Sequence, residues 1–299
     1  MTEVLSVREI VKIFGAVRAV DGVSFSVRQG TITGLLGRNG AGKTTTIRMI
    51  TGIFLPDSGS IEWSNGGRNP QDRIGYLPEE RGLYKKMKIG DQLKFFAELK
   101  NIKGKEADHR VDQWLQKLKL TEWKNKKSME LSKGMQQKVQ FITAVLHDPD
   151  IVILDEPFSG LDPVNVALLK EIVLELKAAH KTIIFSTHQM ELAEQICDDI
   201  CLINRSRKVL DGSLREIKKS FGRNAVALRI EGENGILRDS SLVSKIQQYS
   251  DEMEVLLAPN ADPQDLLRKL VVSGANVTKF EMIEPSLHDI FIEKVSAAE

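Results

Sequence analysis

The sequence predicts an α/β protein whose core is a parallel sheet, followed by a small C-terminal α+β domain. Two short and largely apolar runs, residues 151–154 and 182–186, alternate with amphipathic helical segments, which is typical of parallel strands covered on both faces. A glycine-rich loop connects another short run, residues 30–36, to a helical segment. A shift of composition near Gly222 precedes a tail with strand and helix signals of its own.

Composition and charge exclude several classes of protein. The 299 residues carry 42 Lys and Arg against 41 Asp and Glu, a net charge of +1, whereas a dedicated nucleic-acid binder is usually strongly basic. The apolar runs are far shorter than the ~20 residues of a membrane span, and the N-terminus lacks a signal-peptide pattern. Cys197 and Cys201 are too few for a disulfide scaffold, so we expect a reduced, cytosolic protein. Their spacing would place both on one helical face as buried packing groups.

The first part of the chain combines strand patterns with one helix. Residues 4–11 and 23–27 alternate apolar and polar side chains, which predicts half-buried antiparallel strands that form a β subdomain. Residues 30–36 predict a strand that leads into the glycine-rich loop. Residues 43–51 predict a helix that packs against a sheet through Ile47, Met49 and Ile50.

Residues 85–146 are predicted to form a helical subdomain. Two amphipathic segments mark it, through the apolar sets Leu93, Phe95, Phe96 and Leu99, and Val111, Trp114, Leu115 and Leu118. After the strand at 151–154, Asp162 and Pro163 predict the beginning of a further helix, with Asp as N-cap and Pro at the first position.

The tail is predicted to be a separate small domain, residues 220–299, after a main domain of residues 1–219. Residues 225–230 and 254–258 predict strands, and the segments between and after them predict helices. One of these helices begins at the N-cap Asp262. A final helix has an apolar face formed by Leu287, Ile290, Phe291 and Val295.

A phosphate-binding pattern occupies the glycine-rich loop. Residues 37–44 read GRNGAGKT, which fits G-x-x-x-x-G-K-[ST], and the alternative is an ordinary glycine turn. The glycines let backbone N–H groups face phosphates, and the following helix adds the positive end of its dipole. Lys43 would contact the β- and γ-phosphates, and the Thr44 hydroxyl would bind Mg²⁺. The predicted nucleotide-binding residues are Gly37, Arg38, Asn39, Gly40, Ala41, Gly42, Lys43, Thr44 and Thr45.

Acidic residues follow the strand at 151–154, beside the predicted phosphate loop. Asp155 suits the second protein contact that Mg²⁺ needs, and Glu156, which points elsewhere, could accept a proton from the attacking water. His188 follows the next strand and could hydrogen-bond the γ-phosphate as a neutral imidazole. The alternatives are an acidic pair that caps the turn before Pro157 and a strand-end histidine with only a structural role.

These residues together resemble the ATP-binding subunit of ABC transporters, over about residues 2–214. The phosphate loop, the acidic pair and His188 look like that family's Walker A motif, its Walker B motif with catalytic glutamate, and its H-loop. Residues 131–136, LSKGMQ, resemble the LSGGQ signature, and residues 159–162 resemble the D-loop. The resemblance implies a P-loop NTPase fold, ATP and Mg²⁺ as ligands, and hydrolysis with Glu156 and His188 as catalytic residues.

In this family the signature binds the ATP of a second subunit. The resemblance therefore implies a head-to-tail homodimer or heterodimer in which each ATP lies between Lys43 of one subunit and the signature of the other. It assigns contacts in trans to Ser132, Lys133, Gly134 and Met135. Phe14 occupies the position of the aromatic residue that stacks on adenine, and a core position is the alternative.

Two regions depart from the family's pattern. The signature has Lys133 where glycine is usual, and it has Met135 and the glutamine after it in place of a glycine–glutamine pair. Glu79 stands where a glutamine that binds Mg²⁺ and water is usual. A carboxylate can bind Mg²⁺ but adds negative charge near the phosphates. We therefore expect Glu79 to bind the metal with Thr44 and Asp155. We expect its additional charge to change the rate of ATP hydrolysis without abolishing hydrolysis.

Residues 74–84 and 284–291 narrow the resemblance to sodium-exporter-type ATPases and related ABC-2 exporters. It implies an ATPase that drives a separate permease for sodium or drug efflux, as a peripheral protein on the cytoplasmic face of the membrane. The surface around residues 79–84 and the helical segment would dock the permease. The alternatives are a soluble ABC ATPase that acts on DNA or ribosomes and a nucleotide-binding regulator without turnover. We expect no nucleic-acid partner.

Overall fold

The computed structural model divides the chain into two compact units, Met1–Ser213 and Leu214–Glu299. It describes residues 2–64, 73–80, 82–221, 225–231, 235–248, 252–258 and 261–296. The predicted domain boundary follows residue 219, whereas the structure divides the chain before helix α7 (Leu214–Ser220). Gly222, where the composition shifts, and Arg81, within the exporter-like stretch 74–84, lie outside the described residues.

The first unit is built on a six-stranded sheet with the order β5-β6-β7-β3-β8-β9. Its strands are β3 (Ile32–Leu36), β5 (Ile74–Leu77), β6 (Ile151–Asp155), β7 (Thr182–Thr187), β8 (Asp199–Asn204) and β9 (Arg207–Ser213). Neighbouring strands run parallel from β5 to β8, and the edge strand β9 is antiparallel to β8. The predicted parallel core is therefore confirmed. The three strands β3, β6 and β7 end at the same edge of this sheet, since parallel neighbours point the same way.

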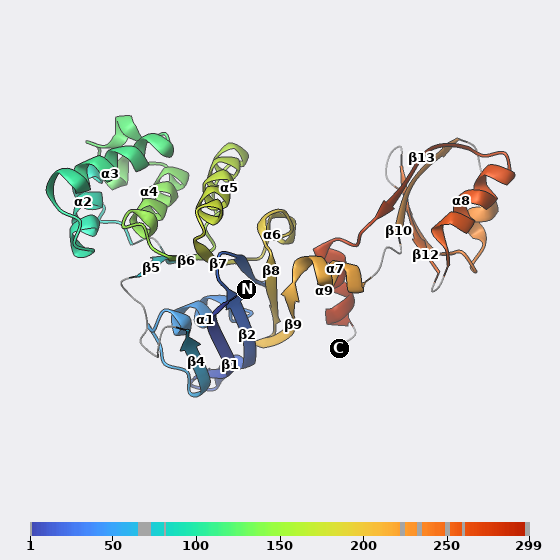
Figure 1. Ribbon diagram of the computed structural model, residues 1–299, viewed down its shortest axis with the longest axis horizontal. Coiled ribbons are helices and arrows are strands. Elements are labelled where there is room, and N and C mark those ends of the chain that lie inside the picture. Colours follow the sequence, from blue (N-terminus) through green and yellow to red (C-terminus); the bar gives the residue numbers. More distant parts are fainter. Residues whose placement is uncertain are drawn as a thin grey trace. The chain divides into compact units, whose positions relative to one another are not determined.

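A second, antiparallel sheet has the order β2-β1-β4. Its strands are β1 (Glu3–Phe14), β2 (Val17–Arg28) and β4 (Ser58–Trp63), and Figure 1 shows them beside helix α1 (Lys43–Ile50). One apolar cluster joins this sheet, α1 and the main sheet through residues such as Val7, Phe25, Ile47 and Ile153. The predicted antiparallel subdomain is confirmed, and α1 packs between the two sheets because its apolar side chains are buried on both sides.

Helices α2 (Ile89–Leu99), α3 (Gly104–Lys117) and α4 (Lys133–Val145) form a separate group at one side of the first unit (Figure 1). The predicted apolar set of α2 is confirmed for Leu93 but is wrong for Phe95 and Leu99, which are exposed. The helix instead buries Ile89 and Ala97 with Leu93. The i, i+4, i+8 spacing of the buried residues selects a different face from the one marked by the aromatic residues. Helix α3 buries Val111 and Leu115 as predicted.

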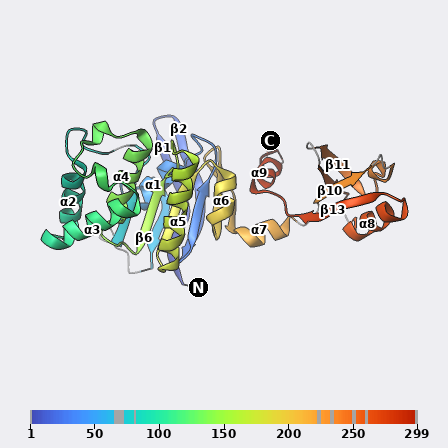
Figure 2. The ribbon, with the colours of Figure 1, turned by 90° about the horizontal axis from the view of Figure 1, so that it is seen from above.

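Two more helices pack beside the main sheet, α5 (Pro163–Ala178) and α6 (Met190–Ile196), as Figure 2 shows from above. Helix α5 begins as predicted, because Asp162 accepts hydrogen bonds from the N–H groups of Val164 and Asn165 at 3.0 Å. The two cysteines do not share a helical face, since Cys197 follows α6 and Cys201 lies on β8. Burial raises the pKa of both thiols, which suits packing groups.

The second unit contains a four-stranded antiparallel sheet with the order β11-β12-β10-β13. Its elements after α7 are β10 (Ala225–Glu231), β11 (Val243–Gln248), β12 (Met253–Leu257), α8 (Pro263–Val272), β13 (Asn276–Ile283) and α9 (Leu287–Ser296). The predicted strands and the helix capped by Asp262 are confirmed. Between the two predicted strands only a 3-10 helix of one turn, Gly235–Arg238, is present among the described residues, and strand β11 follows it. The helix predicted directly after α8 is wrong, because β13 lies there; β11 pairs with β12 and β13 with β10.

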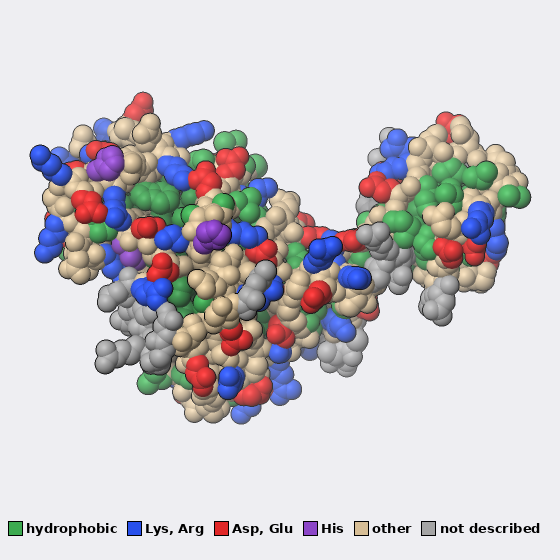
Figure 3. Space-filling view, in the orientation of Figure 1, with side chains coloured by type: hydrophobic (Ala, Val, Ile, Leu, Met, Phe, Trp, Pro, Cys, Tyr) green, Lys and Arg blue, Asp and Glu red, His purple; other side chains and the backbone are tan. Residues whose placement is uncertain are grey.

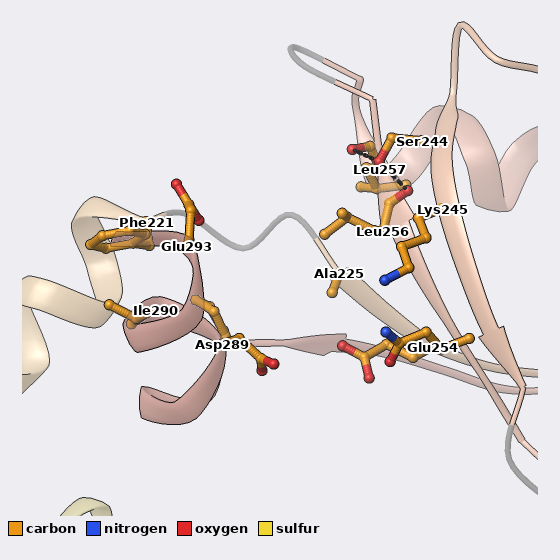
Figure 4. Close-up of a pocket in the computed structure, with 12 residues that line it drawn as sticks. Phe221, Ala225, Ser244, Lys245, Glu254, Leu256, Leu257, Asp289, Ile290 and Glu293 are labelled. Atoms are coloured by element: carbon orange, nitrogen blue, oxygen red, sulfur yellow. Dashed lines mark hydrogen bonds between the residues drawn. The ribbon is translucent and has the colours of Figure 1, made fainter. Parts of the chain in front are cut away.

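The two faces of this second sheet differ. One face shares an apolar core with α8, which includes Val226, Val255, Leu266 and Leu270. On the other side, a cavity of about 460 Å³ is lined by strand residues and by α9. Figure 4 shows Lys245, Glu254 and Leu256 on the strand side of this cavity and Asp289, Ile290 and Glu293 on the helix side.

The surface carries mixed charges. On the face seen in Figure 3, Lys and Arg side chains are interspersed with Asp and Glu side chains. This distribution matches the near-zero net charge and forms no basic stripe on that face. Among the described helices, none has both the length and the apolar character that a membrane crossing requires.

The close contact of β5 with α4 can be tested at Gly75. A Cβ atom on Gly75 would lie 1.9 Å from the carbonyl oxygen of Ala144 and 2.8 Å from Cγ of Pro149. Because the nearest obstacle is backbone, we expect Gly75→Ala to lower the free energy of unfolding by about 1–3 kcal/mol, measured by denaturant unfolding. Gly82→Ala is the control, since its Cβ would meet open space. Equal midpoints for the two variants would contradict this packing.

The division into two units can be tested by truncation. A chain that ends after Ser213 keeps both sheets of the first unit and its apolar core, so it should unfold in one cooperative thermal transition. A chain that ends after Asp198 lacks β8, which pairs with β3 in the middle of the main sheet, and should not fold. Aggregation of the Ser213 truncation would show that the first unit needs the tail.

Candidate functional site

The glycine-rich loop between β3 and α1 curls tightly, and two of its glycines are sterically required. Gly37 has φ +152° and Gly42, the N-cap of α1, has φ +109°. A Cβ atom on Gly37 would lie 2.2 Å from the carbonyl oxygen of Ile203, and one on Gly42 would lie 2.5 Å from that of Ala19. The loop therefore wraps against the neighbouring strands. The N–H groups in the first turn of α1 have no partner within the helix, as an anion site requires.

A cavity of about 210 Å³ lies over this loop. Its lining is formed by Val17, Ala19, Asn39, Gly40, Gly42, Lys43, Thr44, Thr45, Glu79, Glu156 and Ser206. Six of the predicted nucleotide-binding residues are in this set, whereas Gly37, Arg38 and Ala41 belong to the loop without lining the cavity. Val17, Ala19 and Ser206 are not among the predicted residues, because no local sequence pattern marks them. Ser206 reaches the site through its backbone N–H, which donates to the carbonyl oxygen of Ala41 at 3.2 Å.

The Lys43 ammonium is buried at the centre of the site, with 5% of the residue exposed. Its Nζ donates to the carbonyl oxygens of Gly37 at 2.9 Å and Arg38 at 3.2 Å. It also lies 3.3 Å from Oε1 of Glu156. A buried ammonium needs such partners. The same group is placed to contact phosphate oxygens at the mouth of the loop.

Three oxygen-bearing side chains converge beside the lysine. Oγ1 of Thr44 lies 3.2 Å from Oε2 of Glu79 and 3.2 Å from Oδ1 of Asp155. Asp155 is fully buried, and its Oδ2 has no hydrogen-bond partner among the described residues. Burial raises the pKa of this carboxyl, and the hydrogen bonds from Ser186 and Thr44 oppose that rise. Two carboxylates and a hydroxyl fit a hard divalent cation such as Mg²⁺.

Glu156 begins the turn that follows β6, in a left-handed backbone conformation with φ +47°. Its backbone N–H donates to Oγ of Ser186 at 3.0 Å, and this bond holds the residue in its strained conformation. The Glu156 carboxylate lies between Lys43 and Nδ1 of His188, which is 3.1 Å from Oε2. A carboxylate held between two cationic or protic groups can accept a proton and pass it on.

The predicted signature residues lie at the beginning of α4. Ser132 is the N-cap, and its Oγ accepts a hydrogen bond from the N–H of Met135 at 3.3 Å. Gly134 packs against the D-loop, because a Cβ there would lie 3.3 Å from a side-chain methyl group of Leu161. Ser132 and Lys133 are exposed, and the signature does not line the cavity over the phosphate loop of its own chain. Contact with ATP in trans stays a prediction.

Phe14 lies at the tip of the β1–β2 hairpin, and the structure excludes a core position for it. The residue is 44% exposed, and its ring packs edge-on against Phe54 with centroids 5.6 Å apart. Phe14 does not line the cavity, whereas Val17, with which it pairs across the hairpin, does. Its stacking on adenine stays a prediction.

Two family models match the chain. The ABC transporter family matches residues 20–159, which contain the phosphate loop, the signature and the acidic pair. The C-terminal domain of ATP-binding proteins like DrrA1-3 matches residues 212–295, which correspond to the second unit.

Full-length relatives and solved structures agree with these matches. The chain is 46% identical to an uncharacterized ABC transporter ATP-binding protein of Bacillus subtilis, over 98% of this chain and 99% of the relative. It is 32% identical to the Nod factor export ATP-binding protein I of Ralstonia nicotianae, over 90% and 85% of the two chains. The solved ATP-binding subunit of an ABC transporter is similar with a TM-score of 0.66 and 32% identity, over 73% of this chain and 93% of that chain. A dimeric bacterial ABC transporter cassette, 21% identical, shares the fold with a TM-score of 0.66 over 71% and 99%. The chain therefore belongs to the ATP-binding proteins of ABC transporters, and it is an ATP-hydrolysing subunit.

Proposed function

We propose that this ATPase drives export through a separate membrane permease, with Glu156 as the general base. The observation that carries the catalytic part is the buried contact of Glu156 with both Lys43 and His188 at the rim of the cavity. Lys43 binds the phosphates, and Glu156 accepts a proton from the attacking water. His188 orients the Glu156 carboxylate and reaches the γ-phosphate from the end of β7.

Thr44, Asp155 and Glu79 are the side chains that would hold Mg²⁺. The orphaned Oδ2 of the buried Asp155 supports this role, because a divalent cation would satisfy it. The metal would neutralise phosphate charge when bound. Glu79 adds a second carboxylate at this point, so the site is more negative than a glutamine would make it.

In this proposal, a second subunit completes the ATP site when two subunits form a dimer. The exposed Ser132 and Lys133 at the N-terminus of α4 support a contact with the ATP of a second subunit. Gly134 and Met135 lie in the first turn of that helix and would approach the phosphates through their backbone. The partner subunit is a second copy of this chain or a related one.

The permease docks, in this proposal, on an aromatic cluster formed by Tyr84, Phe95 and Phe96. The ring centroids of these residues lie 5.6–6.2 Å apart. Tyr84 is 53% exposed and Phe95 38% exposed, so the cluster presents apolar area to a partner. Since the preceding segment contains Glu79, a partner bound here would sense the nucleotide site. The protein would then act at the cytoplasmic face of the membrane.

Export is supported by the Nod factor export relative and by the match of the second unit to the DrrA1-3-like C-terminal domain. Sodium or a drug is the proposed cargo. An action on DNA or ribosomes is less well supported, because the relatives are described as transporter proteins and the face in Figure 3 lacks a basic stripe.

The role of Glu156 can be tested with Glu156→Gln. The amide keeps the size of the side chain but cannot accept the proton, so we expect turnover to fall about 10²–10⁴-fold while ATP affinity stays close to that of the wild type. Steady-state phosphate release and calorimetry measure the two quantities. Glu171→Gln, on the exposed side of α5, is the matched control and should hydrolyse ATP normally. Wild-type turnover in Glu156→Gln would place the general base elsewhere.

The docking surface can be tested by membrane sedimentation with the permease co-expressed. Phe95→Asp places a charge in the aromatic cluster, so the fraction of the protein that sediments with membranes should fall several-fold. Val272→Asp, at an exposed position on α8, should sediment like the wild type. Equal sedimentation of both variants would contradict docking at the cluster.

A further inference from the structure

Gln140 is a buried polar residue in the middle of α4, with 3% of the residue exposed. Its Nε2 donates to the carbonyl oxygen of Pro78 at 3.1 Å and to that of Glu80 at 2.9 Å. A side-chain amide has two N–H groups, so each carbonyl oxygen can receive one of them. Oε1 of Gln140 has no hydrogen-bond partner among the described residues.

The two carbonyl groups that Gln140 binds are on either side of Glu79. The Pro78 carbonyl belongs to the peptide group that joins Pro78 to Glu79, and the Glu80 carbonyl belongs to the peptide group that follows Glu80. The amide therefore restrains the backbone on both sides of Glu79 and limits the directions that its side chain can take. The Glu79 carboxylate then meets the Thr44 hydroxyl at 3.2 Å. A further side-chain contact of this segment, among the described residues, is the ion pair of Arg48 with Glu80 at 3.1 Å, and the Glu80 side chain is 84% exposed there. Exposed ion pairs of this kind contribute little, so the buried amide is the stronger restraint.

Helix α4 is itself held firmly beside this segment. Its residue Ala144 touches β5 at Gly75, and β5 leads directly into Pro78. Ser132, at the N-terminus of the same helix, lies about 12 Å from Gln140 along the axis. One rigid helix therefore carries both the signature, which faces outward, and the amide that holds the Glu79 segment.

We propose that Gln140 is a positioning residue that sets the Glu79 carboxylate against Thr44 and thereby determines the affinity of the nucleotide site for Mg²⁺. This proposal rests on the proposed metal role of Glu79. Loss of the amide removes the donor from the carbonyl oxygens of Pro78 and Glu80, and the segment relaxes toward other partners. Side chains that support metal ligands in this way change metal affinity about 10–100-fold when they are replaced.

The experiment is a Mg²⁺ titration of the full chain with a non-hydrolysable ATP analogue, followed by calorimetry. Gln140→Met keeps the length of the side chain and removes both donors. We expect the Mg²⁺ concentration for half-maximal analogue affinity to rise about tenfold, and analogue affinity without Mg²⁺ to stay unchanged. Gln92→Met is the matched control. Gln92 is also a fully buried glutamine that hydrogen-bonds the backbone of this stretch, at Tyr84, but away from Glu79.

The same titration in a Glu79→Ala protein distinguishes a positioning effect of Gln140 on Glu79 from a general loss of structure. Glu79→Ala should itself raise the Mg²⁺ requirement, and Gln140→Met added to it should have no further effect, because Gln140 acts through Glu79. Gln140→Asn retains a shorter amide and is the alternative if Gln140→Met does not fold. It should give a smaller shift in the same direction.

The results that would contradict the proposal distinguish an error in the role of Gln140 from an error in the metal role of Glu79. An unchanged Mg²⁺ requirement in folded Gln140→Met or Gln140→Asn, with a raised one in Glu79→Ala, would overturn the positioning role and leave the metal role of Glu79 intact. An equal shift in Gln92→Met, or a further full shift when Gln140→Met is added to Glu79→Ala, would show that Gln140 is only structural. An unchanged requirement in Glu79→Ala would overturn the metal role of Glu79 and, with it, this inference.

Discussion

Three charged groups are buried together at one edge of the main sheet, and the arrangement of the first unit follows from the need to pair them. Lys43, Asp155 and Glu156 are 5%, 0% and 7% exposed. A buried charge without a partner costs several kcal/mol, about 3–5 where one member of a pair is removed. Lys43 is therefore paired with Glu156 and with loop carbonyl groups, and Asp155 accepts hydrogen bonds from Ser186 and Thr44.

The parallel sheet supplies these partners because its strands end together. β3 leads into the phosphate loop, and β6 and β7 are paired so that Asp155 stands opposite Ser186. The Ser186 hydroxyl then donates to the Asp155 carboxylate and accepts from the N–H of Glu156. One side chain on the neighbouring strand thus fixes both acidic residues. Asp155 and Glu156 are adjacent in the sequence, and the Ser186 hydroxyl holds each of them in a different orientation. One can therefore act as a metal ligand and the other as a proton acceptor.

Helix α4 connects this edge to the outer surface through three glutamines. Gln136 donates to the carbonyl oxygens of Ser128 and Leu131, Gln137 to that of Pro157, and Gln140 to the two that flank Glu79. The amides lie on one helix that packs tightly on β5, so the signature region, the turn after the acidic pair and the Glu79 segment are tied to a common support. The second unit has an apolar core of its own.

The sequence by itself determined the parts that are encoded within a few residues: the phosphate loop, the acidic pair and the helix caps at Asp162 and Asp262, because each is one turn of backbone with its own side chains. It did not determine β11 and β13, whose mixed side chains become strands only by pairing with β12 and β10. Nor did it determine the two hydrogen bonds by which Gln140 holds the backbone around Glu79, whose place beside Thr44, 35 residues away, was implied only by the family resemblance. Those contacts depend on the strand order and on the packing of α4 against β5, which bring distant segments to one edge, and only the tertiary structure sets them.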